Sequence, residues 1–258
     1  MKKFITNKIT LTIFGIILFL MLWWMISALV GHGSRIFPDP WSTIAYTAEL
    51  VIKPSTYYHL GWSFLRMLAG FLLGAVFGII FGIFVGNYQK AKHVFEPTVI
   101  ALKAVPTAAL VYLFLVLIGA KNAPIFIVAL ITAPIIYEAV IGGYSNIDAN
   151  ILNSLKLDDR NRIYSNIVVK FPLATPYLLV GMVSSFALSL KIEIMAEVIS
   201  GSTSYGIGNI IKAKQQEDPS DLVPIFAYAL IAIIAILIIT LLLSLLKKKL
   251  NLDDLKKA

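Results

Sequence analysis

The charged residues with the clearest potential for chemistry lie in the stretch LKIEIMAEVISG, where Glu193 and Glu197 are four residues apart. Residues at this spacing share one helix face, so the pattern predicts two neighbouring carboxylates, with Lys191 just before them. Ionisable residues inside a membrane-spanning helix are functional candidates by default. Two like charges on one face would either raise the pKa of one carboxylate or attract a cation. A cationic substrate is therefore one alternative that this pattern leaves open. In the opposing structural interpretation, Glu197 accepts hydrogen bonds from the backbone or from Arg66 and holds the outer loop in place.

Other residue constellations that would indicate an enzyme are missing from the sequence. The chain has no cysteine, and its three histidines, His32, His59 and His93, fall in different segments. No nucleophile, base and acid arrangement is recognisable, and no Gly-x-x-x-x-Gly-Lys-Ser/Thr loop is present to bind a nucleotide. The sequence therefore predicts a protein that is not an enzyme, holds no metal and does not hydrolyse ATP itself.

The elements that carry these residues are helices long enough to cross a membrane. Of 258 residues 59% are hydrophobic, above the roughly one half that is usual for soluble domains. A span needs about 20 apolar helical residues. We therefore predict an all-α polytopic membrane protein, with residues 1–258 as a single transmembrane domain and about six spans, at residues 9–30, 61–85, 99–118, 123–141, 171–190 and 222–246.

The basic charge of the chain follows this topology. Most of the 22 Lys and Arg residues fall in the terminal segments and in the loops that would share their side of the membrane. The positive-inside rule then predicts a multi-pass protein in the lipid bilayer with both termini cytoplasmic. The net charge of +8 is thus explained without nucleic acid, which we do not expect as a partner.

Glycines recur at every fourth residue of the second predicted span. Small residues at this spacing let another helix approach to backbone contact in the membrane. We therefore predict one continuous packing groove, formed by Gly70, Gly74, Gly78, Gly82 and Gly86.

Three further local features are predicted from residue type. Pro106 should kink the third span, and Glu138 of the fourth span should pair with Lys103 or lie at the headgroup boundary. Outside the membrane, Ser42 or Thr43 could cap a short surface helix that begins after the Pro-Asp-Pro turn.

A polar insert at residues 143–170 separates the fourth and fifth spans on the cytoplasmic side. Its apolar residues recur at helical intervals on both sides of the sequence DDRN, which predicts two short amphipathic helices. Asp158 or Asp159 is the expected N-cap of the second helix, and Pro172 is expected in the first turn of the fifth span. Such a pair could lie on the lipid surface, pack under the protein itself, or dock into a groove of a soluble partner.

The order of several motifs resembles the permease subunits of bacterial ATP-binding-cassette importers, in the branch that handles nitrate, sulfonates, taurine and thiamine precursors. The motifs are FPDPWSTI, SFLRMLAGFLLGAVFGIIFGIFVG, LKAVPTAAL, YSNID, VVKFPLATP and MAEVISGSTSYGIGNII. The resemblance implies a type I importer permease fold in a bacterial cell membrane. It also identifies the insert as the cytoplasmic coupling helices that contact the ATPase.

The family signature of this insert has the form E-A-A-x-x-x-G, from which the chain departs. The resemblance puts the E-A-A positions on Asn153, Ser154 and Leu155, and the glycine position on Asp159. Either the ATPase has diverged in step, or the chain is one half of a heterodimer whose other half keeps the signature. The residues that the resemblance assigns to ATPase coupling are Asn153, Ser154, Leu155, Asp158, Asp159, Arg160, Ile163 and Pro172.

The function that the resemblance implies is a permease subunit that forms the path for a small solute delivered by an external binding protein. Its partners would be cytosolic ATPases, which bind the ATP and Mg²⁺, and a second permease copy, in a homodimer or a heterodimer. Candidate residues of the translocation path are Pro106, Lys191, Glu193 and Glu197. The alternative is an ion-coupled secondary transporter that uses Glu193 and Glu197, although no inverted repeat supports it.

Overall fold

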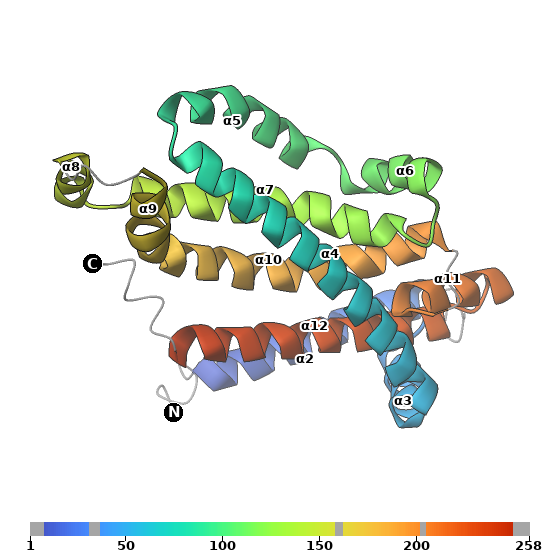
Figure 1. Ribbon diagram of the computed structural model, residues 1–258. Helices are drawn as coiled ribbons and strands as arrows, with labels where there is room; N and C mark the ends of the chain where they lie inside the picture. The colour runs from blue at the N-terminus through green and yellow to red at the C-terminus, as the bar shows by residue number, and fades with distance from the viewer. Residues whose placement is uncertain (1–7, 31–36, 158–161, 202–204, 250–258) are drawn as a thin grey trace.

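The computed structural model describes residues 8–30, 37–157, 162–201 and 205–249, and regular secondary structure in these ranges is helical throughout. Figure 1 shows the helices as an elongated bundle with short helices at its two ends. In chain order the elements are α2 (Lys8–Val30), α3 (Pro40–Ile52), α4 (Pro54–Gly86), α5 (Gln89–Ala104), α6 (Thr107–Ile118), α7 (Ala123–Ser145), α8 (Ala149–Leu157), α9 (Arg162–Ser165), the π-helix η1 (Asn166–Lys170), α10 (Phe171–Ser200), α11 (Ile207–Glu217) and α12 (Val223–Lys249).

Five helical segments of the described chain are long and apolar enough to cross a membrane. A sixth span is formed if α5 and α6, which are bent by 93° relative to each other, are counted together. The all-α polytopic fold predicted from the sequence is therefore confirmed. The start of α2, the end of α12, and α8 with α9 lie at one end of the bundle, and α3 and α11 lie toward the other (Figure 1).

The five glycines at four-residue spacing place α4 directly against α7. A Cβ atom on Gly74 would lie 2.6 Å from the carbonyl oxygen of Ala129 and 2.9 Å from Cβ of Thr132. The same offset of residue numbers holds along the whole contact, so α4 and α7 run parallel. The pairs are Gly70 with Val128, Gly74 with Thr132, Gly78 with Ile136, Gly82 with Val140, and Gly86 with Tyr144.

Small residues also bring α10 against α7. Gly143 meets Ala174, and Gly181 meets Ala139. The numbers rise along one helix as they fall along the other, so α10 runs antiparallel to α7. α4 and α10 also contact each other directly, as the rings of Phe71 and Phe186 do, so a displacement of α10 is passed to α4 both directly and through α7.

The third predicted span is broken at Pro106. The residue before a proline is restricted to extended backbone, and Val105 has φ −66° and ψ 127°. Instead of the expected kink, the chain forms two separate helices here. The first of them, α5, starts at Gln89, ten residues before the predicted start of the span at Val99. An apolar cavity of about 410 Å³ lies between this bent pair and the α4–α7 pair.

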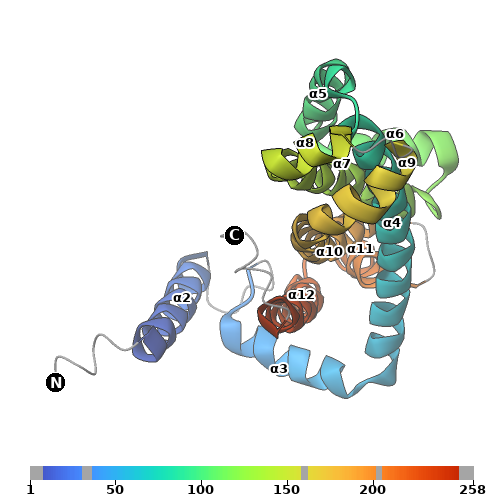
Figure 2. The ribbon, with the colours of Figure 1, turned by 60° about the vertical axis from the view of Figure 1, so that its left-hand side comes forward.

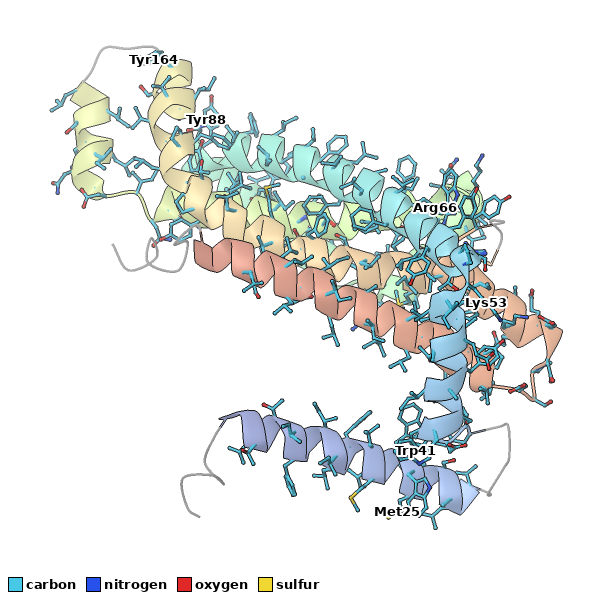
Figure 3. The ribbon with its side chains drawn as sticks, turned by 90° about the horizontal axis from the view of Figure 1, so that it is seen from below. Met25, Trp41, Lys53, Arg66, Tyr88 and Tyr164 are labelled. Carbon is cyan, nitrogen blue, oxygen red and sulfur yellow. The ribbon has the colours of Figure 1, made fainter. Side chains whose placement is uncertain are left out.

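The N-terminal span α2 stands apart from the bundle in Figures 2 and 3, and its contacts described here lie toward its α3 end. The indole nitrogen of Trp23 donates to the carbonyl oxygen of Pro38 at 3.0 Å, and Ser27 Oγ donates to that of Phe37 at 3.0 Å. The side chains of α2 are otherwise largely exposed, as expected of a helix surrounded by lipid.

The N-cap of α3 is Asp39, so the prediction of a cap at Ser42 or Thr43 is wrong. Asp39 Oδ1 accepts hydrogen bonds from the backbone N–H groups of Trp41 at 2.9 Å and Ser42 at 3.0 Å. Asp39 takes this position because Pro40 suits the first helical position, which leaves the preceding residue to cap. The hydrogen bond from the Ser42 backbone N–H is the main cause that holds the pKa of Asp39 below its usual value.

Replacing Asp39 should therefore destabilise α3 in a pH-dependent way. We expect Asp39→Ala to cost about 1 kcal/mol at neutral pH, whereas Asp39→Asn, another good cap, should stay close to the parent protein. Because the folded-state pKa is lowered, the carboxylate contribution is present above the unfolded pKa and is lost as pH falls through the folded value. Thermal unfolding in lipid nanodiscs from pH 7 to pH 3 measures this, and an Asn variant with the parent's acid sensitivity would contradict it.

Candidate functional site

One face of α4 holds the outer end of α10 and the loop that follows it. His59, Ser63 and Arg66 are spaced so that they share this face. His59 Nδ1 accepts from the backbone N–H of Gly206 at 3.1 Å, and Ser63 Oγ accepts from that of Ile207 at 2.9 Å. Side chains of α4 therefore satisfy the backbone N–H groups of Gly206 and Ile207 at the start of α11.

Glu197 is the centre of this outer network and is completely buried. Its carboxylate forms an ion pair with Arg66, whose guanidinium also donates to the carbonyl oxygen of Tyr205. Ser63 Oγ donates to Glu197 Oε2 at 2.8 Å, and the backbone N–H of Gly208 donates to the same oxygen at 2.9 Å. A buried charge needs such pairing and hydrogen bonding, and this is the structural role that the sequence left open for Glu197.

Two glycines let the loop come this close to the carboxylate. Gly206 has φ +138°, a backbone conformation that residues with a side chain rarely adopt. A Cβ atom at this position would also collide with the carboxylate of Glu197. A Cβ on Gly208 would meet Cβ of Glu197 at 2.5 Å. These glycines were not predicted as partners of Glu197. The sequence signal that could have indicated the network is the spacing of His59, Ser63 and Arg66, which puts the three side chains on one helix face.

Glu193 lies one turn before Glu197 on the same buried face of α10. It is completely buried, and neither carboxylate oxygen has a hydrogen-bond partner among the described residues. One turn before Glu193, Ser189 Oγ lies 3.0 Å from Thr132 Oγ1, and this hydrogen bond joins α10 to α7. Within the described chain no three His, Cys, Asp or Glu side chains form a group that could hold a metal ion.

The four predicted path residues are therefore in two different environments. Glu193 and Glu197 are enclosed within the subunit, whereas Lys191 and Pro106 are exposed on its surface. The structure does not bring the two carboxylates to a common accessible cavity with Lys191.

The predicted pairing of Lys103 with Glu138 is confirmed. Lys103 Nζ lies 2.8 Å and 2.7 Å from the two carboxylate oxygens of Glu138, and both side chains are about half exposed. This pair joins the last turn of α5 to α7 beside the break at Pro106.

At the opposite end of the bundle, the insert between the fourth and fifth predicted spans consists of α8, α9 and η1. The predicted pattern of two short helices is present, with α8 ending at Leu157 and α9 starting at Arg162. Asn153 and Ser154 are exposed on α8, and Leu155 is half-buried. Asp158, Asp159 and Arg160, including the predicted N-cap, lie outside the described residues, as does the side chain of Ile163.

The insert joins the fifth span without an interruption. Pro172 lies in the first turn of α10, as expected, but the helical backbone continues into that turn from the insert. Lys170 and Phe171 both have helical dihedral angles, and the Phe171 N–H donates to the carbonyl oxygen of Asn166, five residues back. Pro172 has no N–H to donate, and the π-turn just before it accommodates the irregular bonding. α9, η1 and α10 therefore form one uninterrupted helical segment, which bends where η1 meets α10 (Figures 1 and 3).

The insert exposes apolar side chains beyond the end of the spanning bundle. Leu157 is 87% exposed, and Figure 3 shows Tyr164 at the end of the molecule opposite Arg66. Exposed apolar side chains that lie beyond the spanning helices are candidates for contact with a partner. Here they are Ile151, Leu157, Tyr164, Ile167 and Val168, which we call the apolar tip.

The fold is that of the membrane-spanning subunit of an ABC transporter. It is similar to the crystal structure of an amino acid ABC transporter with histidines, with a TM-score of 0.63, 17% sequence identity, and coverage of 82% of this chain and 99% of that one. It is also similar to the MetNI methionine ABC transporter in inward-facing conformations, with a TM-score of 0.60, 15% identity, and coverage of 79% and 99%.

The chain belongs to the family of binding-protein-dependent transport system inner membrane components, whose model matches residues 74–252. The putative aliphatic sulfonates transport permease protein SsuC of Escherichia coli is 32% identical over 82% of this chain and 81% of its own length. SsuC of Bacillus subtilis is 25% identical over 76% and 70%, and a probable ABC transporter permease protein of Brucella melitensis is 24% identical over 71% and 74%. Members of this family are transport subunits of importers and not enzymes.

Proposed function

We propose that this chain forms the translocation path of an ABC importer together with a second permease copy, two cytosolic ATPases and an external substrate-binding protein. The observation that carries the proposal is the uninterrupted helical segment of α9, η1 and α10, which leads from the apolar tip to the Glu197 network. ATP and Mg²⁺ would be bound by the ATPases. Both termini would be cytoplasmic, on the side of the apolar tip, as the distribution of Lys and Arg supports.

This helical segment would act as a mechanical link between the two sides of the membrane. When ATP closes the ATPases, the apolar tips of the two permease copies would be drawn together. Because the backbone hydrogen bonds continue through η1, the segment would move as one element, so that a displacement of the apolar tip reaches α10. α10 would then move α7 and α4 with it, because glycines bring these helices into close contact. It would also move α11, which Glu197 holds, so that the path opens outward.

The docking of the apolar tip can be tested by a charge on its most exposed residue. Leu157→Glu should abolish most ATPase binding, because an ionised carboxylate would be desolvated in an apolar groove. We expect at least a tenfold loss of ATPase co-purified with the chain, with unchanged thermal unfolding of the permease, since Leu157 contributes little to its packing.

The matched control is Gln216→Glu, which adds the same charge at an exposed position of α11, toward the opposite end of the bundle. It should leave the ATPase co-purified in the parent amount. If Leu157→Glu also retains the ATPase and its stimulation by the binding protein, the apolar tip is not the docking surface.

A further inference from the structure

Four polar side chains recur at every fourth residue along the buried face of α10. They are Ser185, Ser189, Glu193 and Glu197, and each is at most 1% exposed. Residues at this spacing lie one above the other on a helix, so they form a polar stripe inside a bundle that is otherwise largely apolar. Buried polar groups are normally hydrogen-bonded, and three members of the stripe follow this rule.

The hydroxyl groups next to Glu193 on the stripe are committed to other partners. Ser185 Oγ donates to the carbonyl oxygen of Gly181 at 2.8 Å, and Ser189 Oγ donates to that of Ser185 at 2.7 Å. Because Ser189 thereby uses its only proton, Thr132 is the donor in the 3.0 Å contact between their two hydroxyls. Neither serine is thus left to donate to Glu193, whose two carboxyl oxygens have no partner among the described residues.

Glu193 also lies level with an apolar part of the two neighbouring helices. α7 and α10 are antiparallel and are joined at Thr132 and Ser189, so one turn of α10 after Ser189 is level with one turn of α7 before Thr132. That turn of α7 carries Val128, which is fully buried and packs against Gly70 of α4. At the level of Glu193 these helices therefore present a valine and a glycine instead of hydrogen-bonding side chains.

The charged groups that act on Glu193 are Glu197 on its own helix and Arg66 on α4. Arg66 is already paired with Glu197, so the two together do not offset a second negative charge. Lys191 is exposed on another face of α10. α7 carries only Glu138, almost three turns away toward its other end.

The remaining contacts of α10 bring no cation to this level. α6 has no charged residue, the charged residues of α12 are lysines at its C-terminal end, and η1 ends about six turns before Glu193. His59 of α4 accepts a hydrogen bond from Gly206, in the loop before α11. Lys212 of α11 lies against Gly201, two turns beyond Glu193.

An ionised carboxylate at position 193 would therefore lack water, hydrogen bonds and a counter-ion. Burial of such a charge is far more costly than burial of a neutral group, so an isolated carboxyl group takes up a proton instead. Glu193 is thus a carboxylic acid in this state, whereas Glu197, which has an arginine and two further donors, is a carboxylate. The proton is a ligand of the state in which α10 has this position.

We propose that Glu193 is a proton-binding site that couples the position of α10 to pH. A bound proton favours the position described here, and its release favours a position in which α10 brings Glu193 to water or to a cation. By linkage, displacement of α10 by the ATPases becomes easier as pH rises. The proton regulates the ATP-driven cycle and does not drive it. This deepens the proposed function and rests on it for the displacement of α10, but not for the proton site itself.

The proton site is tested by the pH dependence of unfolding of the chain in lipid nanodiscs, with Glu193→Gln as the neutral variant. The unfolded chain loses this proton near about pH 4.3, so above that pH the folded parent holds one proton more than the unfolded parent. The stability that this proton gives is fully present at lower pH and is lost as pH rises. We expect the folding equilibrium constant of Glu193→Gln, divided by that of the parent, to rise about tenfold per pH unit above about pH 5.

Two further variants make this comparison specific. Glu217→Gln removes a carboxylate that is 67% exposed on α11, and it should keep the pH dependence of the parent. Glu193→Met, which also lacks the proton site and has a side chain of similar shape, serves if Glu193→Gln does not fold.

The coupling to α10 is tested by ATP hydrolysis of the assembled transporter with its loaded binding protein, from pH 6 to pH 9. The quantity compared is the ATP concentration for half-maximal hydrolysis, as the ratio of Glu193→Gln to the parent, because this ratio cancels the pH dependence of the ATPase itself. We expect the ratio to increase by about threefold or more over this range, since only the parent is relieved of its proton.

Two results would overturn the proposal. If the stability of Glu193→Gln relative to the parent does not change with pH, Glu193 binds no proton in the folded state. If that stability changes but the hydrolysis ratio stays constant, the proton site is not coupled to the position of α10. Failure of the proposed function is recognised separately, as absence of a bound ATPase from a preparation in which the unfolding result still holds.

Discussion

Arg66→Met is expected to lower the free energy of unfolding by about 3 to 5 kcal/mol, because it leaves the carboxylate of Glu197 buried without its charge partner. Arg66 is 11% exposed and Glu197 is fully buried, so water cannot replace the guanidinium. The variant should also free the loop at Tyr205 from α4. Thermal and denaturant unfolding in nanodiscs would measure the loss.

A second substitution separates the cost of an unpaired charge from the loss of packing. Arg66→Met combined with Glu197→Gln removes both charges and keeps an acceptor for Ser63, so it should regain more than half of the lost stability. Lys121→Met, which removes an exposed cation from an outer turn, should have little effect. Parent-like stability of Arg66→Met alone would show that the ion pair does not hold the outer network.

Gly74→Ala is expected to disrupt the α4–α7 contact. The added Cβ would lie 2.6 Å from a backbone oxygen of α7, so neither a rotamer change nor a flexible side chain can relieve it. We expect a loss of about 1 to 3 kcal/mol, or a displaced helix pair that no longer assembles. Unfolding in nanodiscs and the ATP hydrolysis of the assembled transporter would report these two effects.

The same exchange at Gly142 provides the matched control. Gly142 lies inside α7, and nothing is within 4 Å of the position of its added Cβ. Because alanine is the better helix former, Gly142→Ala should stabilise the protein by up to about 1 kcal/mol. If both variants behave alike, close backbone contact is not the reason for the glycines on α4.

Only one of the two surfaces in the α4–α7 contact could be predicted from the sequence. Glycines at every fourth residue of α4 indicate a groove, but they do not say which helix enters it. The partner α7 carries its own regular series, Val128, Thr132, Ile136 and Val140, at the same spacing. In an apolar span such a series is common, so its match to the glycines became visible only in three dimensions.

The outer network was foreseen only as one of two interpretations. Arg66 and Glu197 are 131 residues apart, and sequence spacing gives no information on such a contact. The burial of Glu193 and Glu197 depends on how α10 rotates between α4 and α7. That rotation is set by packing on all sides, so the sequence pattern could not show that Lys191 is exposed whereas Glu193 and Glu197 face inward.

The positions of the helix breaks were predicted correctly, but the size of the bend and the form of the backbone at each break were not. Pro106 predicts a loss of helical bonding, whereas the 93° bend also depends on where α5 and α6 find partners. Pro172 suggests a helix start, but the π-turn of η1 lets the helix continue through it. In both places the local rule is obeyed, and tertiary contacts decide the outcome.

The central claim is that the chain works as the membrane subunit of an ATP-driven importer. The most direct measurement is ATP hydrolysis by the chain reconstituted in vesicles with its co-purified ATPase, with and without the binding protein, after ionophores have collapsed all ion gradients. The account predicts hydrolysis that the loaded binding protein stimulates and that the gradients do not affect. Solute uptake that follows an imposed proton or sodium gradient, with no ATPase retained, would contradict it.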